Sequence, residues 1–166
     1  MARTHALSMS KGRHELPGQS GHGRDDRFLR WYQFGPADKI AAIRDGIPAS
    51  SLNELSQAMD MPQDDLIRCL GLSRATVKRL AQRHQALSPA DTERLAGMHA
   101  LIGQVQSMSE SNEAIPDREA AKLTARWISV PMPALGGRTA ASYLDTVEGQ
   151  KFISDILAMT QSGAYA

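Results

Sequence analysis

The sequence predicts an all-α fold, and three observations lead to this prediction. Apolar side chains recur every three or four positions in several segments of the 166-residue chain, which is the spacing of one face of a helix. Prolines, glycines and small hydroxyl residues separate these segments where helices would begin and end. No segment shows the alternation of apolar and polar side chains that is typical of a strand. At about 100–200 residues per domain, the length corresponds to one compact domain or two small ones.

The N-terminal segment, residues 1–27, is expected to be a flexible basic arm. It is polar, it is interrupted by glycine and proline, and it has neither a helical nor a strand period. Three of the five histidines lie in it at irregular spacing, so no metal site is predicted there. The next segment is rich in aromatic residues, which we expect to pack against the body, with an exposed partner-binding segment as the alternative: Phe28, Trp31, Tyr32 and Phe34.

Four short helices are predicted before residue 88. Pro36 opens the first helix and Gly46 ends it, while Ser50 and Ser51 are expected to cap the second. The predicted helices cover residues 37–44, 50–59, 62–70 and a segment that begins at 74.

A long helix is predicted to start after Ser88 and to reach about Met108. Its start has a capping hydroxyl, a proline at the first helical position and an acid at the third, in the order that favours a helix N-terminus. Gly136 and Gly137 predict a turn in the C-terminal half, and Thr146 is expected to cap the last helix. The remaining helices are predicted at 117–128, 139–144 and 146–163.

The segment from Gln63 to Arg83 has the form of a helix-turn-helix. Its first helix ends near Gly71, which allows a left-handed turn, and Ser73 caps the second helix. Leu72 is expected to anchor the turn to the core. Four apolar residues would hold the two helices at their steep crossing angle: Leu66, Leu70, Val77 and Leu80.

A basic run coincides with the second helix of this motif. Residues 68–83 hold five basic residues and no acid, a local charge of +5 in a chain whose net charge is +1. Because screening limits each charge to about 8–10 Å, such a run can create a strong surface field in a nearly neutral protein. DNA contacts are therefore predicted for the residues at and after the start of this helix, with an ordinary helical hairpin as the alternative: Ser73, Arg74, Thr76, Lys78, Arg79 and Arg83.

Composition and motifs argue against a disulfide-bonded, membrane-spanning, secreted or enzymatic protein. The single cysteine, Cys69, cannot form an internal disulfide or a thiolate metal site by itself, which fits a reducing, cytoplasmic location. No apolar run approaches the ~18 residues of a membrane span, and the N-terminus lacks the apolar core of a signal peptide. We find no catalytic constellation and no glycine-rich phosphate loop, so the sequence predicts neither an enzyme nor a cofactor or metal.

The C-terminal half carries the most specific pattern. It contains Ala125-Arg-Trp-Ile-Ser-Val-Pro131, then Ala134-Leu-Gly-Gly-Arg-Thr139, Thr146-Val-Glu-Gly149 and a tail that ends Gly163-Ala-Tyr-Ala166. Together with the helix-turn-helix, this succession resembles the Xre/MbcA/ParS antitoxin family from about Gly46 to the C-terminus. The departures are Met132, where an asparagine is common, and Ala140, where a proline usually follows the threonine.

The resemblance implies an antitoxin of a bacterial type II toxin–antitoxin module. Such a protein would have a helix-turn-helix domain at 28–87 and a toxin-binding domain at 88–166. It would neutralise a RES-domain, NAD-consuming toxin by contact and repress its own operon by binding operator DNA, as a homodimer within a larger complex and without a membrane partner. Toxin contacts are implied for Trp127, Gly136, Gly137, Thr139, Gly163, Ala164, Tyr165 and Ala166.

Two other interpretations stay open from the sequence. The chain could be a stand-alone DNA-binding regulator with a C-terminal oligomerisation or effector domain. Alternatively, the helix-turn-helix could have become a dimerisation or scaffold element that no longer binds DNA.

Overall fold

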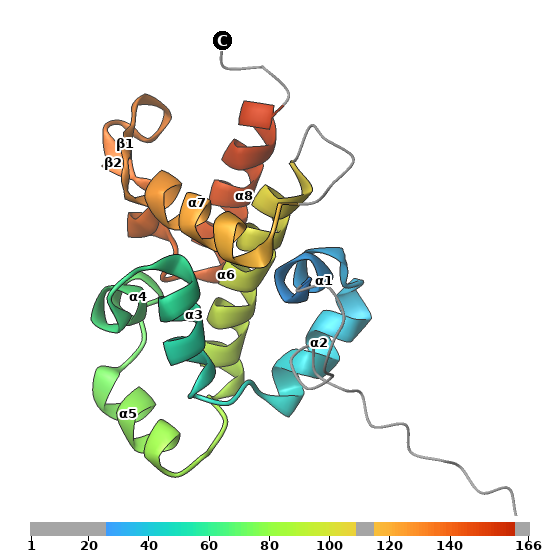
Figure 1. The fold of residues 1–166 in the computed structure, drawn as a ribbon, viewed down its shortest axis with the longest axis vertical. Helices are drawn as coiled ribbons and strands as arrows, with labels where there is room; N and C mark the ends of the chain where they lie inside the picture. Colours follow the sequence, from blue (N-terminus) through green and yellow to red (C-terminus); the bar gives the residue numbers. More distant parts are fainter. Residues whose placement is uncertain (1–25, 109–114, 162–166) are drawn as a thin grey trace, which may run out of the picture.

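Helix α6 (Pro89–Ser107) is the centre of the fold, and helices from both halves of the sequence pack against it (Figure 1). The computed structural model describes residues 26–108 and 115–161. Over these residues the predicted all-α class is confirmed. Because α6 contacts α1 and α2 as well as α7 and α8, it connects the N-terminal and C-terminal halves into one body.

The other helices follow the predicted order, apart from α1, which the sequence pattern did not predict as a helix. Their bounds are α1 (Arg27–Gln33), α2 (Pro36–Asp45), α3 (Ser51–Met59), α4 (Gln63–Cys69), α5 (Arg74–Gln82), α7 (Asp117–Ser129) and α8 (Val147–Gln161), with 3-10 helices η1 (Pro133–Leu135) and η2 (Ala140–Tyr143). The short helix predicted at 139–144 is thus a 3-10 helix. None of the helices in the described ranges is long and apolar enough to cross a membrane.

Three of the predicted helix caps are confirmed. The side chain of Ser73 accepts a hydrogen bond from the backbone N–H of Thr76 at 3.3 Å, and the side chain of Ser88 accepts one from Asp91 at 3.2 Å. Thr146 caps α8 in the same way, through the N–H of Gly149 at 3.0 Å. The predicted cap at Ser50 is wrong, because its backbone is already helical and its side chain makes no capping bond. The caps that formed each satisfy a donor that the helix leaves unpaired.

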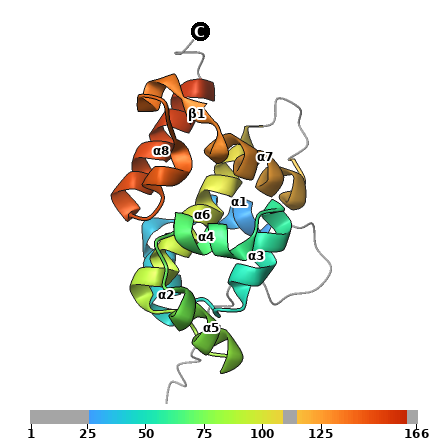
Figure 2. The ribbon, with the colours of Figure 1, turned by 90° about the vertical axis from the view of Figure 1, so that its left-hand side faces the viewer.

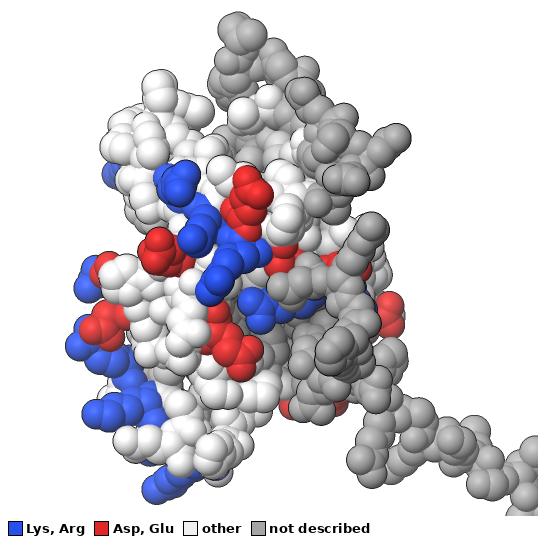
Figure 3. Space-filling model, viewed as in Figure 1, with Lys and Arg blue, Asp and Glu red and all other residues white. Residues whose placement is uncertain are grey.

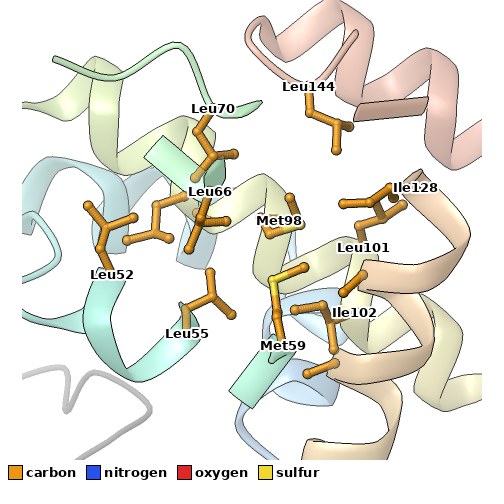
Figure 4. Packing of buried hydrophobic residues seen from close by; sticks show 14 of the residues in the cluster. Leu52, Leu55, Met59, Leu66, Leu70, Met98, Leu101, Ile102, Ile128 and Leu144 are labelled. Carbon is orange, nitrogen blue, oxygen red and sulfur yellow. The ribbon is translucent and has the colours of Figure 1, made fainter. Parts of the chain in front are cut away.

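One apolar core extends from the helix-turn-helix into the C-terminal half. Leu52, Leu55, Met59, Leu66 and Leu70 lie on one side of α6 residues Met98, Leu101 and Ile102, and Ile128 and Leu144 lie on the other (Figure 4). All ten of these residues are at most 3% exposed. Since burying such a side chain contributes about 1.5–3 kcal/mol, this shared core makes the two halves interdependent.

Helix α1 docks directly on α6, as the aromatic residues of segment 28–34 predicted. Phe28 and Trp31 are buried, whereas Tyr32 remains exposed. Arg27 belongs to this helix and not to the arm: its backbone N–H donates to Asp117 at 3.2 Å, and its guanidinium lies 3.7 Å from Glu54. The rest of the predicted arm lies outside the described residues apart from Asp26.

A small antiparallel hairpin departs from the expectation that no strand is present. Strand β1 (Pro131–Met132) pairs with β2 (Arg138–Thr139), with Pro131 opposite Thr139. Two-residue strands are too short to show an alternating pattern in the sequence. Gly136 and Gly137 form the predicted turn between them, with φ values of 63° and 81° that favour glycine.

Candidate functional site

The helix-turn-helix is formed by α4, α5 and a tight turn between them. Gly71 has a φ of 61°, and Leu72 is buried beneath the turn, as predicted. The turn is also tied to α6, because Arg94 donates through Nη1 to the carbonyl oxygens of Leu70 at 3.2 Å and of Gly71 at 2.8 Å. These bonds satisfy two carbonyls that the end of α4 would otherwise leave unpaired. The position of α5 is therefore set by its own turn and by the central helix together.

The predicted DNA-contacting residues lie together along α5 and at its two ends. Ser73 is exposed at the N-cap, Thr76 is half-exposed, and Arg83 is exposed at the C-cap. Lys78 and Arg79 are exposed and, like Arg83, form no ion pair with any described residue. In Figure 3 the basic side chains of this region form an edge of the molecule at the lower left. One helix thus presents several exposed basic side chains that a polyanion could contact.

Two of the five basic residues in the run are paired with acids of α4. Arg74 Nη2 lies 2.6 Å from Asp64 Oδ2, and Arg68 Nη1 lies 2.9 Å from Asp65 Oδ1. These acids lie four and three residues before the start of the window 68–83, so the local charge of +5 overstated the field at this surface. The three cations without a described partner are Lys78, Arg79 and Arg83.

The predicted toxin-contacting residues fall into three groups. Gly136 and Gly137 are exposed in the hairpin turn, and Thr139 is half-buried on β2. Trp127, on α7, is half-buried and packs against the core. The tail residues Gly163, Ala164, Tyr165 and Ala166 lie outside the described residues, but they follow α8 directly. Figures 1 and 2 both show the hairpin and the C-terminal end of α8 at the same end of the molecule.

Close backbone packing holds the start of α8 in place. A Cβ on Gly149 would lie 1.8 Å from the carbonyl oxygen of Tyr143, so only glycine fits in this first turn. Glycine in a helix costs about 1 kcal/mol relative to alanine. The structure gives the reason, which is the contact between α8 and η2.

A groove between the two halves of the chain was not predicted. It has a volume of about 760 Å³ and lies between the C-terminal end of α3, helix α4, helix α7 and the segment from β2 to η2. Its charged lining comes from Asp60, Asp65 and Arg68 on one wall and from Lys122 and Arg126 on the other. The basic wall on α7 is the one part of the groove that the sequence indicates, because Lys122 and Arg126 are four residues apart and share a helix face.

Cys69 lines this groove as a thiol. Its Sγ lies 3.6 Å from the carbonyl oxygen of Ala141, to which the thiol donates. Burial, and secondarily the negative charge of Asp145, raises the pKa of Cys69 to about 11. Since the thiolate is the nucleophilic form, Cys69 is unsuited to covalent chemistry at neutral pH.

Among the described residues, no group of side chains could hold a metal ion. The imidazole of His99 lies against Phe28 and Trp31, with ring centroids 5.3 and 6.0 Å away. Although part of the residue remains accessible, Nδ1 is buried without a hydrogen-bond partner. Burial, with a smaller effect from Arg27, lowers the pKa of His99 to about 3, so this histidine stays neutral at physiological pH.

The chain matches known families in both halves. Residues 38–98 match the antitoxin Xre-like helix-turn-helix domain, and residues 118–163 match the antitoxin Xre/MbcA/ParS C-terminal toxin-binding domain. A "Prs ADP-ribosylating antitoxin" from Sphingobium sp. (strain YBL2) is 38% identical over 135 residues, which cover 81% of this chain and 85% of that protein. The helix-turn-helix and the C-terminal domain described above thus correspond to the two parts of an antitoxin. The chain belongs to the Xre/MbcA/ParS antitoxin family and is a non-enzymatic antitoxin of a toxin–antitoxin system.

Proposed function

We propose that this antitoxin neutralises a RES-domain, NAD-consuming toxin by placing its C-terminal tail at the toxin's active site. The observation that carries the proposal is the match of residues 118–163 to a toxin-binding domain whose last helix leads directly into the tail. The name of the Sphingobium relative associates that protein with ADP-ribosylation, a reaction for which NAD is the usual donor. The hairpin lies at the same end of the molecule, where it would support the tail (Figure 2).

Deletion of the tail tests this mechanism. The purified toxin encoded beside the antitoxin gene is titrated with the full chain, with a chain that ends at Gln161, and with a chain whose residues 162–166 are replaced by glycine and serine. We expect both altered chains to bind the toxin and to leave its NAD consumption intact. Full inhibition by the truncated chain would contradict the role of the tail.

We also propose that α5 binds operator DNA and that the antitoxin represses its own operon in the cytoplasm. The exposed Lys78, Arg79 and Arg83 support this, because cations on a recognition helix reach phosphates and base edges. Changing Arg74, Lys78 and Arg79 to alanine should weaken binding to the promoter fragment and reduce its salt slope by about 0.9 per lost phosphate contact. A triple alanine variant at the exposed Arg30, Arg44 and Arg138, which lie outside α5, serves as the control.

One observation favours the alternative in which the helix-turn-helix is a scaffold. Asp64 and Asp65 occupy the first turn of α4, and Asp64 is paired with Arg74 at the start of α5. These carboxylates repel phosphates that approach the start of α4. If the α5 variant binds the promoter fragment as tightly as the wild type, with the same salt slope, the scaffold interpretation holds.

We propose a homodimer within the toxin–antitoxin complex. An apolar groove of about 430 Å³ between α1, α2, α6 and α8 supports it, since exposed Tyr32, Ile40 and Val147 line it. Surface apolar groups that gather in one groove are typical of interaction sites. Sedimentation of the full chain and of an Ile40→Glu variant tests this, with loss of the dimer expected in the variant.

A further inference from the structure

Helix α7 carries a stripe of three basic residues, with Glu119 beside it, that the proposed tail mechanism does not use. Arg118, Lys122 and Arg126 are spaced four residues apart, so they lie on one face of the helix. The opposite face is buried and consists of small and apolar residues such as Ala121 and Ile128. Arg118 and Arg126 are exposed and Lys122 is half-exposed. None of the three forms an ion pair with a described residue.

This stripe is unfavourable for the helix itself. Like charges four residues apart repel each other on a helix surface, and a cation in the first turn opposes the helix dipole. A solvated helix face gains stability when acidic and basic residues alternate along it, for example when an acid lies four residues before a lysine. The stripe instead contains two successive pairs of like charges, Arg118 with Lys122 and Lys122 with Arg126. This repulsion points to an external anionic partner.

The stripe is separate from the basic surface of α5. Figure 3 shows basic side chains gathered over α7 and a second basic region over α4 and α5, with acidic side chains between them. Asp60 and Asp65 line the groove that separates α7 from α4, on the wall opposite Lys122 and Arg126. A DNA backbone that continued from α5 to α7 would have to cross these carboxylates, so a uniformly anionic polymer is disfavoured there.

The groove also connects the stripe to the proposed toxin interface. Thr139 of the hairpin lines it together with Lys122 and Arg126. The groove has one basic wall, one wall with two acids, and hydroxyl groups from Ser129 and Ser142. A folded protein surface, which presents charges of both signs and hydrogen-bonding groups, matches such a mixed lining better than a nucleic acid does.

We propose that the α7 stripe receives an acidic segment of the cognate toxin, that the adjoining groove contacts the toxin surface around this segment, and that the stripe steers the association of the toxin with the antitoxin. This inference rests on the proposed toxin-neutralising function. The α5 surface then remains available for DNA, so the two partners occupy different basic surfaces. Steering of this kind raises the association rate and depends strongly on salt.

Charge reversal of the stripe tests the proposal. The full chain with Lys122→Glu and Arg126→Glu is compared with a control that carries Arg30→Glu and Arg44→Glu. The control has the same change in net charge, and its two exposed positions on α1 and α2 line neither this groove nor the apolar groove between α1, α2, α6 and α8. Association rates with the catalytically inactivated toxin are measured at about 50 and 200 mM salt, and binding of the promoter fragment is measured by fluorescence anisotropy.

We expect the stripe variant to associate with the toxin about tenfold more slowly at low salt, with little remaining salt dependence, while the control and the promoter affinity change little. An unchanged toxin association rate would overturn the inference and leave the proposed function standing. If the stripe variant loses affinity for the promoter fragment but associates normally with the toxin, the inference is wrong and the stripe binds DNA. If the wild type does not bind the toxin at all, the proposed function and the inference both fail.

A second measurement, chemical cross-linking, identifies the toxin group that contacts Lys122 and does not depend on the folding of the glutamate variant. A carbodiimide couples a lysine amine to a carboxylate within contact distance, so Lys122 in the wild-type complex should form an amide with a toxin carboxylate. Lys122→Arg keeps the charge, and we expect it to retain the association rate but to lose this cross-link. If the double glutamate variant does not fold, Lys122→Gln with Arg126→Gln replaces it, with a rate reduction in the same direction. Absence of any cross-link from Lys122 to the toxin contradicts the proposal.

Discussion

The carbonyl oxygen of Phe28 occupies the space that a side chain on Gly103 would need. A Cβ at Gly103 would lie 2.1 Å from this oxygen, and 2.8 Å from the Cβ of Tyr32. Helix α1 therefore approaches α6 more closely than any other residue at this position would allow. The contact brings Phe28 and Trp31 into the core and places Arg27 next to the buried carboxylate of Asp117.

Gly103→Ala should destabilise the protein by about 1–3 kcal/mol, even though alanine is the better helix former. The backbone of α1 cannot move away from the new methyl group without uncovering Phe28. Urea unfolding followed by circular dichroism measures the change. Gly97→Ala is the matched comparison, because its Cβ would meet the side-chain amide of Gln150, at 1.8 Å from Oε1. A side chain can rotate away at the cost of its hydrogen bonds, so we expect the smaller loss there.

Arg94→Ala should loosen the turn of the helix-turn-helix. The guanidinium donates to the carbonyl oxygens of Leu70 and Gly71 and also pairs with Asp91, and the substitution leaves two carbonyls without this donor. We expect a loss of about 1–3 kcal/mol in the free energy of unfolding and faster amide hydrogen exchange around residues 70–73. Arg44→Ala, at an exposed position, is the control. Unchanged exchange at the turn in the Arg94 variant would show that α5 is held by its own cap and core contacts alone.

The stability of the protein should fall as the pH drops below about 6.5, in part because of His99. The folded-state pKa of His99 is lowered from 6.5 to about 3, so between these values the unfolded chain binds a proton that the folded chain does not. The stabilisation is therefore present above pH 6.5 and is lost as the pH falls towards 3, with a slope of at most about 1.4 kcal/mol per pH unit. Urea unfolding at several pH values measures it. His99→Gln should reduce the slope, and the exposed His84→Asn should not.

Cys69 should react slowly with iodoacetamide in the folded protein at pH 8. Its pKa of about 11 leaves very little thiolate at that pH, and part of the residue is covered by the segment around Ala141. The same chain in urea should be alkylated at the rate of an ordinary thiol, as followed by mass spectrometry. Equal rates in the two conditions would mean that the groove does not bury the thiol.

The helix-turn-helix could be predicted from the sequence because its determinants are local. Gly71 and Ser73 lie within a few residues of the turn that they make, and the spacing of Leu66, Leu70 and Val77 follows from the period of a helix. For the same reason the caps at Ser88 and Thr146 were predicted correctly. The hydrogen bonds that cap a helix end form between residues close in sequence, so they do not depend on the remainder of the fold.

Only the tertiary structure determined how charges and surfaces combine. The pairs of Asp64 with Arg74 and of Asp65 with Arg68 reduce the charge that the basic run presents. The groove places Lys122 and Arg126 opposite Asp60, more than 60 positions away in the chain, because α6 and the shared core bring α7 beside α3 and α4. Periodicity shows which face of a helix is buried but not which other helix covers it. The sequence alone therefore determined the all-α class, the caps and the antitoxin resemblance, whereas long-range packing decided which surfaces remain open to DNA and to protein.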